Sequence, residues 1–144
     1  MSGLVVRSFE PDDRASVVSL WDRCDLTRPW NDPNRDIDRK LTTDPTGFLV
    51  GLSDGQVVAS VMVGYDGHRG WINYLAVDPD RRGAGWGRAI MGAAEDLLAE
   101  RGCPKVNLQI RTSNISAVRF YESIGYTLDD VVSMGRRLVD DGAD

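Results

Sequence analysis

Residues 77–102 read VDPDRRGAGWGRAIMGAAEDLLAERG, a glycine-rich turn followed by a segment with apolar periodicity. From Trp86 onward, apolar residues recur at i+4, i+7 and i+11, which predicts a helix of about three turns, and Gly102 is a typical residue after a helix end. Three glycines occupy alternate positions where this helix begins: Gly83, Gly85 and Gly87. Glycine costs roughly 1 kcal/mol relative to alanine inside a helix. The glycines therefore indicate either a plain surface turn or a backbone that a ligand must approach closely.

A strand, a glycine-rich turn and a helix form an anion site. The first amides of the helix have no helical acceptor, and the helix dipole adds about half a positive charge at that end. Arg81, Arg82 and Arg88 add further positive charge. A P-loop is excluded because Arg88 and an alanine follow the last glycine instead of lysine and serine or threonine. A dinucleotide fingerprint is excluded because the spacing is G-x-G-x-G and no acidic residue ends the next strand.

The flanking sequence predicts a mixed α/β fold. We expect a first strand at 4–9, a helix at 10–25 and a short helix that Asp32 caps and Pro33 opens. Short apolar runs separated by Asp-Gly turns predict three antiparallel strands: 48–52, 57–65 and 71–77. After the glycine helix come a strand at 105–110, a short helix within 112–126, and one or two strands within 127–139. We therefore expect a mostly antiparallel sheet of six to seven strands flanked by about four helices, with parallel strands on either side of the glycine helix.

Composition limits the function classes. A chain of 144 residues that is 42% hydrophobic fits one globular domain, 1–144. The formal net charge of -5 argues against a general nucleic-acid binder. Cys24 and Cys103 are far apart and outside any metal-ligand spacing, so we expect neither a disulfide framework nor a metal site. The sequence has no signal-like start and no apolar run of ~20 residues, so we expect a cytoplasmic protein without a membrane partner.

Two motifs resemble those of one known superfamily. Arg82-x-x-Gly85-x-Gly87 resembles the acetyl-CoA pyrophosphate loop of the GNAT N-acetyltransferases. NISAVRFYESIGY, residues 114–126, resembles the second motif of that superfamily, and a strand separates the two as the family requires. Segments such as WDRCDLTRPWNDP, YDGHRG and RGCPK are similar to the small bacterial YpeA-type branch, whose substrates are poorly assigned. The resemblance covers essentially the whole chain.

The resemblance implies direct transfer of an acetyl group from acetyl-CoA to a primary amine, without a metal. It implies that Tyr121 protonates the departing thiolate, since a phenol with a reference pKa near 10 is close enough to a thiol to act as its acid. It implies that the strand before the loop pairs with the pantetheine arm and that the loop backbone holds the pyrophosphate. The implied cofactor contacts are Leu75, Ala76, Val77, Arg82, Gly83, Ala84, Gly85, Trp86, Gly87, Arg88 and Asn114.

The general base and the acceptor site stay open at this point. Many relatives carry an acid on the fourth strand, but here WINYLAV offers only Asn73 and Tyr74 as polar side chains. A water chain to Asp66 or Glu122, or the single histidine His68, are alternatives. Candidate acceptor contacts lie between the first two helices and the turn of the third and fourth strands: Trp30, Asn31, Asp32, Tyr65, Asp66, His68 and Tyr74. The mild acidity would suit a cationic acceptor such as an N-terminus, a lysine or a polyamine.

A second hypothesis is a GNAT-fold module that binds acyl-CoA as a sensor or partner without turnover. The missing carboxylate on the fourth strand favours it. Tyr121 and Asn114 oppose it, because a pure binder has less need of an acid for a thiolate. The expected partners are acetyl-CoA and an amine, with either a monomer or a homodimer as the assembly.

Overall fold

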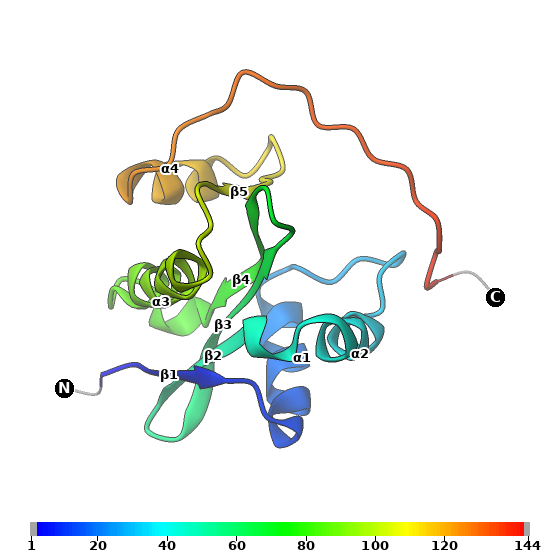
Figure 1. Ribbon diagram of the computed structural model, residues 1–144. Helices are drawn as coiled ribbons and strands as arrows, with labels where there is room; N and C mark the ends of the chain where they lie inside the picture. Colours follow the sequence, from blue (N-terminus) through cyan, green and yellow to red (C-terminus); the bar gives the residue numbers. More distant parts are fainter. Residues whose placement is uncertain (1–2, 143–144) are drawn as a thin grey trace.

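A twisted sheet with helices on both faces forms the frame of the protein (Figure 1). The computed structural model describes residues 3–142. Its five strands follow one another across the sheet in sequence order: β1 (Val5–Ser8), β2 (Phe48–Ser53), β3 (Gln56–Tyr65), β4 (Gly70–Val77) and β5 (Val106–Leu108). Neighbouring strands are antiparallel except β4 and β5, which are parallel. The predicted mixed sheet, with its parallel pair on either side of the glycine helix, is confirmed.

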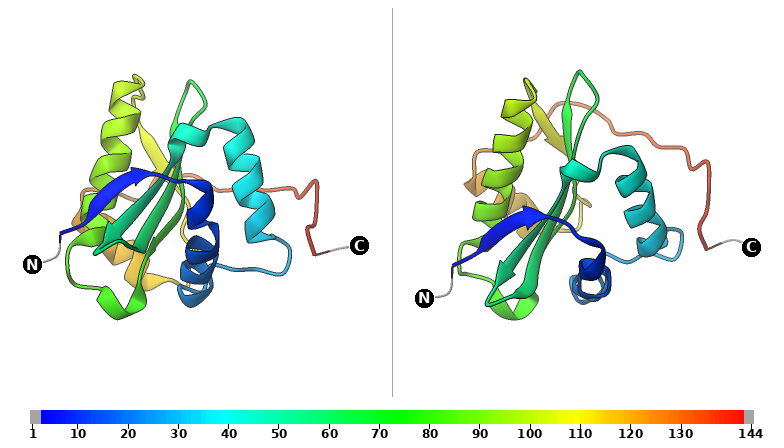
Figure 2. Two further views of the ribbon diagram at one scale, coloured as in Figure 1. Left: turned by 90° about the horizontal axis from the view of Figure 1, so that it is seen from below. Right: turned by 60° about the horizontal axis from the view of Figure 1, so that its bottom comes forward.

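Four α-helices cover the two faces of this sheet, as Figure 2 shows. One face carries α1 (Arg14–Arg23) and α2 (Pro33–Thr43), and the other carries α3 (Trp86–Glu100) and α4 (Ile115–Ser123). Short 3-10 turns precede α1, β2 and α3: η1 (Pro11–Asp13), η2 (Pro45–Gly47) and η3 (Pro79–Arg81). As predicted, Asp32 caps α2, and its carboxylate accepts a hydrogen bond from the Asn34 amide at 2.9 Å.

The alternation of side chains along the strands divides the core into two layers. In β2, Phe48 and Val50 are fully buried against α1 and α2, whereas Leu49 packs with α3 on the opposite side. Trp21 of α1 is completely buried in the first layer and Ile90 of α3 in the second. The sheet therefore has no solvent-facing side over its central strands, and a ligand can reach it only at an edge or where two strands separate.

The predicted number of strands, six to seven, is wrong. Residues 127–139 were expected to add one or two strands, but they form an extended segment that joins no ladder among the described residues. The reason is physical: strand structure requires a hydrogen-bonded neighbour, and between Thr127 and Asp140 no backbone group makes a backbone hydrogen bond to another described residue.

Candidate active site

Strands β4 and β5 form a fork. They pair over only three residues each, with Gly70 opposite Val106 and Ile72 opposite Leu108. Beyond Ile72, β4 continues to Val77 while β5 has already ended. The edge of β4 from Asn73 to Val77 therefore has no strand beside it in the described chain, and its backbone can accept a ligand as an added strand.

A bulge interrupts β4 within this open stretch. The pairs Met62–Asn73 and Ser60–Ala76 leave Tyr74 and Leu75 opposite the single residue Val61. The extra residue reverses the alternation, so that Ile72 and Leu75 face α3 while Tyr74 and Ala76 face α1.

The bulge also decides which backbone groups of β4 are free. The Asp78 amide bonds to the Val58 carbonyl at 2.8 Å. By the two-residue alternation of an antiparallel ladder, Ala76 is then engaged with Ser60, and the amide of Val77 points to the open edge. The Val77 carbonyl accepts a weak hydrogen bond from the Cys24 thiol at 3.3 Å. Of the cofactor contacts expected on this strand, the Val77 amide is therefore free to meet a ligand at the open edge, and the Ala76 amide is not.

The glycine loop lies at the end of this open edge. Gly83 and Gly85 have φ of 93° and 81°, a left-handed conformation that glycine adopts without strain, and the loop from Arg82 to Gly85 is exposed. The Ala89 amide makes the first helical bond, to the Gly85 carbonyl at 3.1 Å. The amides that precede it in α3 therefore have no helical acceptor, as expected at a helix start. The loop thus has the free amides and the positive helix end that an anion requires.

Two residues of the loop region, Trp86 and Gly87, contribute to packing. Trp86 is buried, with 8% of its surface exposed, and Arg81 lies 6.0 Å from the centre of its ring, so Trp86 can offer a ligand only its backbone. A Cβ at Gly87 would lie 3.0 Å from the Phe120 ring. Gly87 therefore allows close packing of α3 against α4, which differs from the ligand approach that motivated its selection.

The second motif forms α4, on the same side of the sheet as α3. Asn114 caps this helix, because its Oδ1 accepts a hydrogen bond from the Ala117 amide at 3.2 Å. Tyr121 packs edge-on against Phe120 and Tyr126, with ring centres 5.1 and 5.7 Å away. Burial raises the pKa of Tyr121 to about 12. The hydroxyl of Tyr121 is therefore protonated at neutral pH and able to donate a proton.

On the other face, Tyr74 is held at the bulge in a strained conformation. Its φ of 53° is unusual for a residue with a side chain. The Tyr74 ring stacks on the Trp21 ring, with the two ring centres 3.9 Å apart. Ser60 Oγ donates a hydrogen bond to the Tyr74 carbonyl oxygen at 2.9 Å. The Tyr74 hydroxyl donates to Asp36 Oδ2 at 2.6 Å. Burial, followed by the bond to this carboxylate, raises the pKa of Tyr74 above its usual range.

Asp36 is the residue that sequence reasoning missed. It lies on α2, nearly forty positions from β4 in sequence, and its side chain retains 19% exposure. Its spacing in α2 carries no motif, and only the fold brings it to Tyr74. A carboxylate from a neighbouring helix thus lies beside β4, which carries none of its own.

The end of the described chain packs against α2, beside the Asp36–Tyr74 pair. Arg39 bridges Asp36 and Asp141, with Nη1 lying 3.0 Å from an oxygen of each. The Asp141 carboxylate also accepts from the Asp32 amide at 2.9 Å. We call these contacts of Arg39, Asp32 and Asp141 the clasp. Arg39 is the main reason that the pKa of Asp141 lies well below its usual range.

Apart from Tyr74, the predicted acceptor residues separate into two groups. Trp30, Asn31 and Asp32 lie at the clasp: Arg137 donates to Asn31 Oδ1 at 2.9 Å, and its guanidinium lies 6.0 Å from the Trp30 ring centre. The second group, Tyr65, Asp66 and His68, lies at the hairpin between β3 and β4, away from the clasp. There the Tyr65 hydroxyl contacts the Gly102 carbonyl at 3.5 Å, and Asp66 accepts from the amides of His68 and Arg69. Of the predicted set, the structure brings only Tyr74 to a carboxylate at the open part of β4.

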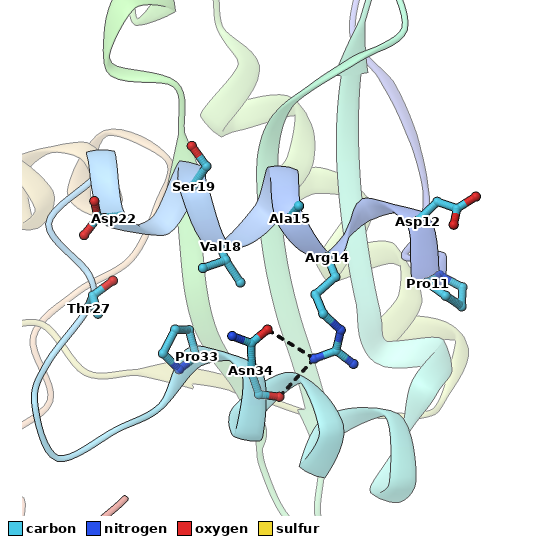
Figure 3. Close-up of a pocket in the computed structure, with 10 residues that line it drawn as sticks. All are labelled: Pro11, Asp12, Arg14, Ala15, Val18, Ser19, Asp22, Thr27, Pro33 and Asn34. Atoms are coloured by element: carbon cyan, nitrogen blue, oxygen red, sulfur yellow. Dashed lines mark hydrogen bonds between the residues drawn. The ribbon is translucent and has the colours of Figure 1, made fainter. Parts of the chain in front are cut away.

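An open hollow of about 700 Å³ lies between α1 and α2 (Figure 3). The Arg14 guanidinium crosses it to the carbonyl and side-chain oxygens of Asn34, at 3.1 and 3.4 Å. None of the predicted site residues lines this hollow. The fork and its loop, which are defined by backbone groups at an open edge, are the better candidate for the site.

Neither a metal cluster nor a membrane helix is found in residues 3–142. No group of three or more histidine, cysteine, aspartate or glutamate residues is placed to hold a metal ion there. None of the helices in this range has the length and apolar character that a membrane crossing needs.

Known proteins match this chain over most of its length. Residues 15–126 match the model of the Acetyltransferase (GNAT) family. The chain is 48% identical to an acetyltransferase of Pectobacterium atrosepticum over 136 residues, which are 94% of this chain and 96% of the relative. It is 50% identical over 137 residues to an acetyltransferase of Sodalis glossinidius, with the same coverage.

Solved structures share the fold. The crystal structure of Ard1 from Thermoplasma volcanium superposes with a TM-score of 0.79 at 30% identity, covering 88% of this chain and 84% of that one. An aminoglycoside N-acetyltransferase in complex with CoA superposes with a TM-score of 0.75 over 96% of this chain and 97% of that one, at 14% identity. The family match over residues 15–126 and the two relatives that are 48% and 50% identical show that the chain belongs to the GNAT acetyltransferase family.

Proposed function

We propose that this chain is an acetyl-CoA-dependent N-acetyltransferase, which transfers an acetyl group directly to a primary amine of a small molecule or a protein. Family membership supports acetyl transfer. The observation that carries the proposal is the junction of an open β4 edge with a left-handed glycine loop at the start of α3. At that junction, a free strand edge that can pair with the extended pantetheine arm lies next to an anion site that can bind the pyrophosphate of the same cofactor.

The residues present fit the cofactor. In our proposal the amides from Gly83 to Arg88 hold the pyrophosphate, with the exposed Arg82 and Arg88 side chains as counter-charges. The open edge at Leu75–Val77 pairs with the pantetheine arm, and the Val77 amide stabilises negative charge as it develops on the thioester oxygen. Asn114 uses its Oδ1 as the helix cap, so its Nδ2 is the group that would donate to the pantetheine.

Tyr121 and Asp36 move the two protons of the proposed reaction. The amine nitrogen bonds to the thioester carbonyl carbon, and the carbon–sulfur bond breaks. The departing sulfur takes the proton of the Tyr121 hydroxyl, and the amine gives its proton to the Asp36 carboxylate. Both groups then exchange protons with solvent and return to their starting states.

The Asp36–Tyr74 pair supports a catalytic reading over a purely binding one. A strained tyrosine at a bulge, bonded to a partly exposed carboxylate, is costly for the fold and is typical of functional sites. It also supplies the base that the sequence of β4 lacks. In our proposal, Asp36 takes the place of the carboxylate whose absence from β4 favoured a sensor without turnover.

The direct test is an amine screen. The protein is incubated with acetyl-CoA and, separately, with a free N-terminal peptide, a lysine peptide and a polyamine, and thiol release and acetylated product are measured. We expect thiol release that depends on one class of amine, with a matching acetylated product. Tight binding of acetyl-CoA with no acceleration by any amine class would contradict the enzyme and support the acyl-CoA-binding module.

A further inference from the structure

At the clasp, the Asp141 carboxylate lies among three residues that donate hydrogen bonds or carry positive charge. Arg39 donates to both of its oxygens, through Nη1 at 3.0 Å and Nη2 at 2.5 Å. The Asp32 amide donates to Oδ2 at 2.9 Å, and Arg35 Nη1 lies 3.6 Å from Oδ1. Only 2% of the Asp141 side chain is exposed. Because guanidinium groups and backbone amides are strong partners of a carboxylate, we call Arg35, Arg39 and the Asp32 amide the carboxylate subsite.

Arg39 joins the carboxylate subsite to the proposed base. Its Nη1 lies 3.0 Å from Asp36 Oδ1 and 3.0 Å from Asp141 Oδ2. Because both distances start at the same nitrogen, the two carboxylate oxygens are no farther apart than twice that distance. An amine bonded to Asp36 and a ligand carboxylate in the place of Asp141 are therefore separated by only a few covalent bonds. A single small molecule that carries both groups fits this spacing.

The segment that carries Asp141 is attached to the fold by few contacts near the subsite. Within 127–140, no backbone group makes a backbone hydrogen bond to another described residue. The Asp141 amide bonds to the Trp30 carbonyl at 3.1 Å, and Arg137 contacts Asn31 at 2.9 Å. Segments with so few contacts open locally at a far lower free energy than the packed core. A ligand carboxylate therefore competes with a local contact of the chain and does not have to disturb the core.

We propose that the carboxylate subsite binds the acceptor of the acetyl transfer proposed above, on which this assignment rests, and that the acceptor is a small amino acid. Its primary amine lies a few bonds from its carboxylate. Asp141 occupies the subsite when no acceptor is bound, and the acceptor carboxylate displaces it. The amine gives its proton to Asp36 and attacks the thioester as described above, while the carboxylate only orients the molecule.

The local charges favour such a zwitterion over a polyamine or a lysine side chain. Once Asp141 leaves, the guanidinium groups of Arg35 and Arg39 lack the anion that they shared. A second cationic group of a polyamine would lie against these two positive charges, and a lysine side chain brings no carboxylate at this spacing. A zwitterion supplies one charge of each sign, the ammonium to Asp36 and the carboxylate to the arginines.

Matched pairs of amines test the class of acceptor, and amino acids join the amine screen as a further class. Glycine, β-alanine and 4-aminobutanoate are each compared with their primary amides by kcat/KM for acetyl transfer. We expect at least one acid to exceed its amide by about tenfold to a hundredfold, because hydrogen bonds to charged groups are the stronger ones. The amides have more unprotonated amine at neutral pH, so amine basicity cannot produce this preference. Amides that react as well as the acids, or turnover of a polyamine or lysine peptide alone, would overturn the proposal.

Arg35→Gln tests the subsite without touching the base, since Arg35 has no contact with Asp36 among the described residues. The test uses an Asp141→Asn background, because Arg35 also binds the competing Asp141. Asp141→Asn alone should lower KM for the amino acid by a few-fold. Adding Arg35→Gln should raise that KM by about tenfold and leave KM for the amide unchanged. Adding Arg14→Gln instead, which removes a guanidinium bonded to Asp38 of the same helix, should change neither KM.

Binding without turnover separates the subsite from the reaction. N-acetyl-β-alanine carries the carboxylate but no free amine, and its titration into the wild-type chain is followed by NMR at the Asp32 and Asp141 amides. We expect a saturable shift at Asp32 and a move of Asp141 toward its unstructured position, and neither with N-acetyl-β-alaninamide. No response, or an equal response to the amide, would overturn the subsite even if acetyl transfer is observed. The expected response without turnover of any amine would support the subsite and contradict the proposed function.

Discussion

On the face covered by α3 and α4, the groups proposed to bind and protonate the cofactor lie in two short runs of sequence, 75–88 and 114–121. On the face covered by α1 and α2, the side chains around the proposed base come from separate elements: Tyr74 from β4, Asp36 from α2, and Asp141, which shares Arg39 with Asp36, from the end of the described chain. In the proposed reaction the first face acts mainly through backbone groups, and the second through side chains. A phosphate can bind to any backbone that exposes its amides. Binding and deprotonating an amine requires particular side chains, which the fold brings together.

The largest expected effect is the loss of acetyl-CoA binding on the face covered by α3 and α4. In Gly85→Glu, a side chain and a negative charge enter the loop where the pyrophosphate is proposed to bind. We expect acetyl-CoA binding to fall below detection by calorimetry, because the like charge and the bulk both oppose the phosphate. The matched control is Gly102→Glu at the other end of α3, where φ is 82°, close to the 81° of Gly85. If the two variants lose binding equally, backbone strain and not the anion site explains the loss.

The next effect separates chemistry from binding on the same face. Tyr121→Phe removes the proposed acid and keeps its packing against Phe120 and Tyr126. We expect kcat to fall by about 10²–10⁴-fold, the usual range for a lost general acid, with unchanged affinity for acetyl-CoA. Tyr126→Phe is the control, because it removes a neighbouring hydroxyl that bonds only to Glu95 at 2.8 Å. Equal kcat values for Tyr121→Phe and wild type would remove Tyr121 from the mechanism.

A smaller effect should come from the second face. Asp36→Asn keeps the shape of the side chain and removes its basicity, so we expect kcat/KM for the amine to fall by roughly tenfold to a hundredfold. The loss should shrink at high pH, where more of the amine is already deprotonated. Asp38→Asn on the same helix, which breaks only an exposed pair with Arg14, should leave the pH–rate profile unchanged. A profile of Asp36→Asn that parallels wild type would show that Asp36 is not the base.

The smallest effect concerns the clasp and its pH dependence. The folded-state pKa of Asp141 is depressed by Arg39, so the clasp is fully present above the unfolded pKa near 3.9 and is lost as pH falls through the lower folded value. The protection of the Asp32 and Asp141 amides against hydrogen exchange, relative to an unstructured amide at the same pH, should therefore persist at neutral pH and be lost only in strong acid. Asp141→Asn should show fast exchange already at neutral pH, with at most a few-fold change in KM for the amine. Exchange that does not respond to Asp141→Asn would show that other contacts hold this end of the chain.

The same contrast explains what could be predicted from the sequence. The glycine loop, α3 and α4 carry local signals, namely turn glycines, a capping Asn114 and helical periodicity, and all of them appear in the structure. Asp36 carries no such signal, because its contact with Tyr74 depends on a bulge in β4. The prediction of strands within 127–139 was wrong for a related reason. Their apolar residues have strand-like composition, but a strand is completed by a neighbour, and the described chain supplies none.

Calorimetric titration of the wild-type chain with acetyl-CoA, desulfo-CoA and NADH tests the central claim, that the fork of β4 and β5 with its glycine loop is an acetyl-CoA site. The account predicts saturable binding of both CoA compounds with one site per chain, and no binding of NADH, because the loop lacks the dinucleotide spacing. A folded sample that binds neither CoA compound would show that the glycine loop is only a turn, and would contradict the proposed reaction.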